Sequence, residues 1–127
     1  MIRVLLPLAA LGFAVLAALP SQAASFDCDK AEAPDEVAIC ANPDLSALDS
    51  QMGGLWYAYS KVPMLMGANG ARHDEAEAFL EARAACGGNV ACLADLYDAR
   101  IETLEQHISD QMEIFACFVT GDGVNCN

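Results

Sequence analysis

Six cysteines in a short chain with an export-type leader constrain the fold of this protein more than any other feature of its sequence. The first 23 residues combine a positive start at Arg3, an apolar run from Val4 to Leu19 and small residues at Ser21 and Ala23. We therefore expect a signal peptide over residues 1–23, with cleavage after Ala23. All six cysteines lie in the remaining 104 residues, which predicts a small exported domain held together by disulfides.

The leader is not expected to remain as a membrane anchor. Its apolar run is followed by the helix-breaking Pro20, and no later segment approaches the length of a membrane-spanning helix. A lipid anchor would need a cysteine directly at the cleavage point, whereas the first cysteine is Cys28. We expect a soluble protein, periplasmic or secreted, without a membrane anchor after cleavage.

The length and charge of the chain limit the number of domains it can form and the kinds of partner it can bind. Residues 24–127 form one domain, because chains divide into several domains only well beyond this size. The net charge of −12 becomes −13 once Arg3 is removed, which argues against binding to nucleic acid. It favours a basic partner, although an acidic surface can also serve solubility alone.

Proline and glycine signals divide residues 24–127 into four expected helices. Pro34 and Pro43 occupy first-turn positions that tolerate proline, Pro63 ends the second helix, and Gly87 begins the turn that ends the third. No segment alternates apolar and polar residues with a period of two. We therefore expect an all-α fold, a small disulfide-stapled bundle of antiparallel helices with a disulfide-bracketed C-terminal tail. The expected helices span residues 34–40, 43–62, 73–86 and 90–115.

Two of these helices carry apolar residues at spacings of three and four, which predicts the faces that form the core. Gly53 and Gly54 interrupt the first of these faces, so either that helix bends there or another segment packs closely against it. The face of the second helix comprises Leu45, Leu48, Met52, Leu55 and Tyr59. That of the fourth comprises Leu93, Tyr97, Ile101, Leu104, Ile108 and Phe115.

Six cysteines allow many connectivities, and their spacing favours short-range pairs. We predict the disulfides Cys28–Cys40, Cys86–Cys92 and Cys117–Cys126. The alternative is a zinc site, but the chain has no Cys-x-x-Cys pair, and only His73 and His107 supply imidazole. No metal or other cofactor is therefore expected.

Several segments resemble a known family. They are Phe26–Ala31, Glu36–Cys40, Asp44–Asp49, Arg83–Cys86, Cys92–Leu93, Tyr97 and Arg100–Ile101. Together they closely resemble the lysozyme inhibitor LprI family of exported bacterial proteins, over roughly residues 26–104. The resemblance implies inhibition of lysozyme, a cationic muramidase, by occlusion of its cleft. The chain departs from the family where Phe79 replaces a usual tryptophan and where Met52–Gly54 replaces an alanine-rich stretch, and Cys117 and Cys126 lie outside the region of resemblance.

The motif residues are interpreted mainly as structural. Asp49 is expected to act with Arg83 or Arg100 as an ion-pair or capping partner. Glu36 is expected near the positive N-terminus of a helix, with Lys30 as its surface partner.

We predict that the protein is not an enzyme. His107, Ser109 and Asp110 are near neighbours on one helix, where such residues do not converge. Paired carboxylates indicate nothing in a chain with 18 acidic residues.

Two features predict partner binding. Asp95, Asp98, Glu102 and Glu105 recur at helical spacing and form an acidic strip, either a solvated face or one that steers a cationic protein. Asp74, Glu75, Glu77 and Glu81 form a second acidic cluster on the preceding helix.

The second feature is the segment 63–71, which is expected to be a loop and carries Met64, Leu65 and Met66. These side chains either pack against the helices as core or protrude and enter a target cleft.

The predicted function is that of an exported protein-binding domain, by analogy with the family an inhibitor of lysozyme. Two alternatives remain at this stage. One is an envelope adaptor that binds another exported protein without inhibiting it, and the other is an immunity-type or chaperone-like partner of a secreted toxin.

Overall fold

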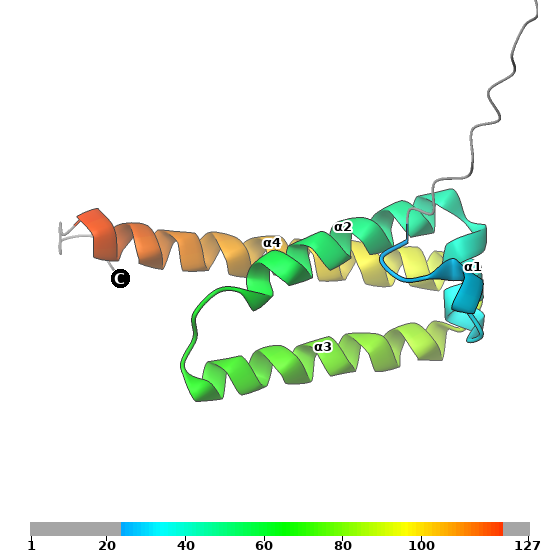
Figure 1. Ribbon diagram of the computed structural model, residues 1–127, viewed down its shortest axis with the longest axis horizontal. Coiled ribbons are helices and arrows are strands. Elements are labelled where there is room, and N and C mark those ends of the chain that lie inside the picture. The colour runs from blue at the N-terminus through cyan, green and yellow to red at the C-terminus, as the bar shows by residue number, and fades with distance from the viewer. Residues whose placement is uncertain (1–23, 121–127) are drawn as a thin grey trace, which may run out of the picture.

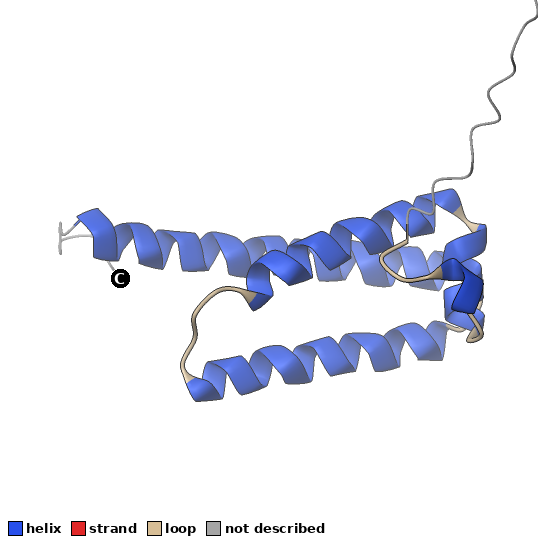
Figure 2. Ribbon diagram, in the orientation of Figure 1, coloured by secondary structure: helices blue, strands red, loops and turns tan. Residues whose placement is uncertain are grey.

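A computed structural model describes residues 24–120 of the chain. Within this range the protein is all-helical and has no strand (Figures 1 and 2). The elements are the 3₁₀ turn η1 (Cys28–Lys30) and the helices α1 (Pro34–Ala41), α2 (Pro43–Ser60), α3 (Met66–Cys86) and α4 (Val90–Thr120). The predicted all-α fold class is therefore confirmed.

The three long helices lie side by side, and the short α1 lies across one end of them (Figure 1). Helix α2 packs most extensively on α4 and runs parallel to it, while α3 runs in the opposite direction. The end formed by η1, α1 and the turn at residues 87–89 is called here the stapled end. The opposite end, formed by residues 59–72 and 107–120, is called the open end.

Local signals begin and end the helices at the stapled end. The Asn42 side chain accepts hydrogen bonds from the backbone N–H of Asp44 at 3.0 Å and of Leu45 at 3.2 Å, and so caps α2. Gly87 follows α3 with a φ of 53°, a conformation that favours glycine. The predicted limits of α1, the start of α2 and the end of α3 are confirmed within one residue.

At the open end, three helix limits differ from the sequence prediction. Helix α2 ends at Ser60, two residues before its predicted end. Helix α3 begins at Met66 instead of near residue 73, so most of the expected loop is helical despite Gly67 and Gly70. Buried Arg72 accounts for the difference, because it donates hydrogen bonds to the carbonyl oxygens of Tyr59 and Val62 and fixes this turn against the end of α2. Helix α4 continues to Thr120, five residues beyond its predicted end.

The core lies toward the stapled end, where Ile39, Leu45, Phe79, Leu93 and Tyr97 form one buried cluster. The predicted α4 stripe is buried from Leu93 to Leu104 and half-buried at Ile108. Its last member, Phe115, is 67% exposed, so this part of the prediction is wrong. The cause is the end of α2 at Ser60, beyond which that helix no longer covers α4.

Gly53 is the site of the close packing considered for α2. A Cβ at this position would lie 3.0 Å from the Cβ of Ser25, in the segment that precedes η1. At Gly54 a Cβ would meet no atom within 4 Å. Only the first of the two glycines, Gly53, is therefore needed for close packing of another segment against α2.

Two of the predicted disulfides are present, both at the stapled end. Cys28–Cys40 and Cys86–Cys92 each join Cα atoms 5.7 Å apart. Cys117 is not a free thiol, but its predicted partner Cys126 and the predicted tail beyond residue 120 lie outside the described residues. The third pairing stays a prediction.

The arginine and lysine pairings differ from those expected. Arg83 forms a buried ion pair with Asp35 at 2.8 Å, and Arg100 lies 3.4 Å from Glu75 on α3, so neither arginine pairs with Asp49. Asp49 instead accepts hydrogen bonds from the Tyr97 hydroxyl and a backbone N–H. Lys30 pairs with Asp27 at 3.2 Å and not with Glu36, which accepts from the N–H groups of residues 32 and 33.

Candidate functional site

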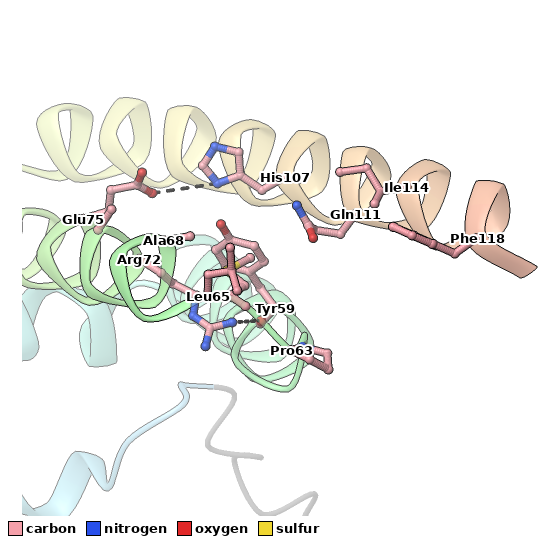
Figure 3. Close-up of a pocket in the computed structure, with 12 residues that line it drawn as sticks. Tyr59, Pro63, Leu65, Ala68, Arg72, Glu75, His107, Gln111, Ile114 and Phe118 are labelled. Carbon is pink, nitrogen blue, oxygen red and sulfur yellow. Dashed lines mark hydrogen bonds and ion pairs between the residues drawn. The ribbon is translucent and has the colours of Figure 1, made fainter. Parts of the chain in front are cut away.

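A groove of about 690 Å³ opens at the open end, between the end of α2, the start of α3 and the second half of α4 (Figure 3). Apolar side chains supply most of its surface, and a few polar side chains also line it. The lining residues are Tyr59, Pro63, Met64, Leu65, Ala68, Ala71, Arg72, Glu75, His107, Gln111, Ile114 and Phe118.

Helix α4 forms one wall of the groove because its buried face continues beyond the end of α2. His107, Gln111, Ile114 and Phe118 follow one another at spacings of three and four, in line with buried Leu104. Residues 108–120 extend α4 by about 20 Å at 1.5 Å per residue. In Figure 1 this extension projects past the ends of α2 and α3, so its apolar face is largely uncovered within the described chain.

The opposite rim of the groove is formed by the connection between α2 and α3. Leu65 is 86% exposed and Met66 is 92% exposed, whereas Met64 is half-buried. The interpretation that places Leu65 and Met66 in the core is therefore wrong. Phe118, across the groove on α4, is 83% exposed. Large apolar side chains thus face solvent on both sides of the same hollow.

Arg72 anchors the floor of the groove. Its guanidinium donates to the carbonyl oxygens of Tyr59 at 2.7 Å and Val62 at 3.0 Å, and also to the side chain of Asn69. A positive charge beside the last carbonyls of a helix is favourable, because those groups carry the negative end of the helix dipole. Arg72 therefore holds the start of α3 against the end of α2 and keeps the groove in shape.

A second polar group joins α3 to α4 at the inner end of the groove. One carboxylate oxygen of Glu75 lies 3.4 Å from Arg100 Nη1 and 3.8 Å from His107 Nδ1. The imidazole of His107 also lies against the Tyr59 ring, with centroids 5.3 Å apart. Burial and the nearby charge of Glu75 raise the pKa of Tyr59, although Arg72 and Arg100 act in the opposite direction. The Tyr59 phenol therefore stays neutral at physiological pH.

The acidic strip lies on a different face of α4 from the groove. Asp95, Asp98, Glu102 and Glu105 are all exposed, as predicted. At 100° per residue they cluster on the side of α4 away from Tyr97 and Leu104. In the second acidic cluster only Glu75 turns inward, to Arg100, while Asp74, Glu77 and Glu81 are exposed without an ion pair among the described residues. The structure thus separates the two predicted binding features.

Sequence reasoning singled out the segment 64–66, of which Met64 and Leu65 line the groove, and missed the α4 wall. The predicted end of α4 at residue 115 removed Phe118 from any helical face, and Gln111 and Ile114 were not assigned to one. The signal that could have found this wall was the unbroken spacing of three and four from Leu104 through Phe118.

The described residues contain no cluster of three or more histidine, cysteine or acidic side chains able to hold a metal ion. They also contain no helix that is long and apolar enough to cross a membrane. What the groove offers is an apolar surface with a small polar floor, a composition suited to holding an apolar side chain of another molecule.

In comparisons with known proteins, no family model matches the chain, and no curated protein or solved structure is significantly similar to it.

Proposed function

We propose that this protein is an exported binding domain that captures a cationic protein, and that the groove at its open end is the contact surface. The observation that carries the proposal is the exposure of Leu65 and Phe118 on opposite sides of one groove, with the exposed Met66 next to Leu65 in the chain. Lysozyme is the partner implied by the family resemblance, and inhibition by cleft occlusion is the proposed activity.

The exposed apolar rim supports a binding role on physical grounds. Large apolar side chains grouped on the surface of an otherwise highly charged small domain favour association, since contact removes them from water. A few such anchors near the centre of an interface supply most of its binding free energy. Leu65 and Met66, at the tip where α2 joins α3, are placed to enter a concave partner.

The acidic surfaces support a cationic partner without forming the contact themselves. The chain has a net charge of −12, and exposed carboxylates lie on the outer faces of both α3 and α4. Charges of one sign attract an oppositely charged protein over several ångströms and raise its association rate more than its final affinity. The acidic strip would therefore guide the partner, and the groove would hold it.

The test uses the mature, oxidised domain and purified lysozymes of different classes. Association and dissociation rates are measured by biolayer interferometry, and muramidase activity is measured on peptidoglycan. The double variant Leu65→Ser/Met66→Ser should lose at least about tenfold in affinity, mainly through faster dissociation. Leu80→Ser is the control, because Leu80 is an exposed apolar residue of α3 that lies outside the groove.

Equal affinity of the double variant and the wild type would overturn the groove as contact surface. Changing Asp95, Asp98, Glu102 and Glu105 to their amides should slow association severalfold while leaving dissociation unchanged. If the strip is only a solvated face, the association rate will not change. Tight binding with full muramidase activity would reject inhibition and favour the adaptor role.

A further inference from the structure

The segment that precedes η1 is packed into the domain and is fixed there by several contacts. Ala24 and Phe26 pack against the core, and the guanidinium of Arg83 lies 5.6 Å from the centroid of the Phe26 ring. Ser25 fits against Gly53 of α2, as described above. The Cys28–Cys40 disulfide then ties the segment to α1. These contacts give the backbone at Ala24 and Ser25 a defined position beside α2.

The first residues of this segment lie beside a buried carboxylate, that of Asp49. Asp49 of α2 is fully buried, with 0% of its surface exposed. One of its oxygens accepts a hydrogen bond from the Tyr97 hydroxyl at 2.7 Å, and the other accepts from the backbone N–H of Ser25 at 2.5 Å. Both contacts use Asp49 as an acceptor, which is how an ionised carboxylate bonds.

Asp49 forms no ion pair with a basic side chain within residues 24–120. The other buried carboxylate, Asp35, has the guanidinium of Arg83 at 2.8 Å. A buried charge without a counter-ion is costly, and native proteins normally pair such groups. The two hydrogen bonds reduce this cost for Asp49. Arg83 acts on the Tyr97 hydroxyl but is itself paired with Asp35, so no basic side chain contacts Asp49 directly.

A positive charge would arise beside Asp49 if the leader is removed after Ala23. Cleavage there makes Ala24 the first residue, and its backbone nitrogen becomes an α-ammonium. Covalent geometry places this nitrogen within about 4 Å of the Ser25 nitrogen. Since the Ser25 nitrogen is hydrogen-bonded to Asp49, the ammonium would lie no more than about 6 Å from the carboxylate, within the distance at which an opposite charge stabilises the charged form of a group.

We propose that the α-ammonium of Ala24, created by removal of the leader, is the counter-ion of Asp49, and that this ion pair completes the core of the mature domain. The proposal depends on cleavage after Ala23 and is independent of the groove and its partner. In the precursor, a neutral amide stands at Ala24 and Asp49 lacks its cation. The precursor is therefore less stable than the mature domain.

The test compares four oxidised forms of residues 24–127 made by chemical synthesis. They are the chain with a free amine at Ala24, the same chain acetylated at Ala24, a chain extended by Gly-Ser before Ala24, and the variant Lys30→Gln. Acetylation removes the charge, and the extension moves it away. Each should lower the melting temperature by about 5 to 10 °C. Lys30→Gln is the matched control, since it removes an exposed ammonium. It should shift the melting temperature by only about 1 °C.

Two further measurements assign the effect to Asp49. In Asp49→Asn, acetylation of Ala24 should no longer change the melting temperature. In the unmodified chain, the pKa of the Ala24 amine, followed by NMR, should lie at least about one unit above the ordinary value of about 7.7 to 8.0. This titration needs no Asp49 variant and so decides the matter even if Asp49→Asn does not fold. An ordinary amine pKa, or equal melting temperatures of the free and acetylated chains, would overturn the proposal.

Discussion

The stapled end and the open end of the bundle differ in how many of their side chains are buried or bonded and how many are exposed to solvent. At the stapled end, two disulfides, the Asp35–Arg83 pair and a buried apolar cluster hold η1, α1 and the starts of α2 and α4 together. At the open end, the continuation of the same α4 face meets solvent, and Leu65, Met66 and Phe118 are left exposed. The difference shows that the buried contacts are concentrated at one end, while the other end leaves large apolar side chains in contact with solvent.

Truncation of a large apolar side chain should give the largest difference in stability between the two ends. Leu93→Ala, in the fully buried cluster, should lower the free energy of unfolding by about 2 to 5 kcal/mol. Phe118→Ala, at the open end, should change it by no more than about 0.5 kcal/mol. Urea unfolding followed by circular dichroism measures both. A cost at Phe118 comparable to that at Leu93 would mean that the open end is part of the folding core.

Removal of single disulfides tests the staples themselves. Cys28→Ser/Cys40→Ser opens a loop with a sequence separation of 12, and Cys86→Ser/Cys92→Ser opens one of 6. The chain-entropy model gives losses of about 3 and about 2 kcal/mol, respectively. Urea unfolding of the two double variants gives the comparison. If neither loss exceeds about 0.5 kcal/mol, the disulfides do not account for the stability of this end.

Tyr97→Phe tests the hydrogen bond to buried Asp49. Loss of this donor should lower the free energy of unfolding by about 1 to 3 kcal/mol at neutral pH. Burial, followed by the hydrogen bond to Asp49, raises the pKa of Tyr97 above its unfolded value. The neutral phenol therefore contributes stability that is fully present below about pH 10 and is lost as the pH rises further.

The alkaline part of the stability profile supplies the control for this prediction. The Tyr97→Phe variant should lose less stability than the wild type between neutral pH and pH values above about 10. Parallel profiles for the two proteins would contradict the role given to Tyr97.

Leu65→Ser should produce the smallest effect, and it should be stabilising. Leu65 occupies the N-cap position of α3 and makes no side-chain capping hydrogen bond. Serine is a preferred N-cap residue, so the variant should gain about 0.5 to 1 kcal/mol in the free energy of unfolding while affinity for the partner falls. Thermal unfolding and binding, measured on the same sample, test the predicted gain in stability and the predicted loss of affinity. A fall in stability would indicate that Leu65 supports the fold.

The stapled end was predictable because its determinants are local in sequence. Close cysteines pair across short turns, Asn42 caps the helix that begins next to it, and Gly87 supplies the backbone conformation that ends α3. The same reasoning predicted most of the core, since the apolar spacing of α2 and α4 specifies which faces meet.

The open end was less predictable because its determinants join residues distant in sequence. The start of α3 depends on Arg72 reaching the carbonyl groups at the end of α2, which no local pattern contains. The exposure of Phe115 depends on where α2 stops, although its spacing on α4 is that of a core residue. The pairing of Arg83 with Asp35 likewise crosses between helices.

The most direct test of the division between the two ends is amide hydrogen exchange of residues 24–127 in oxidised form, alone and saturated with lysozyme. Alone, the slowest amides should lie around Leu45, Leu93 and Tyr97, and residues 108–120 should exchange much faster. With the partner bound, new protection should appear at residues 63–72 and 108–118, with little change at the stapled end. New protection confined to α1 or to the acidic strip, or none with any class of lysozyme, would contradict the account.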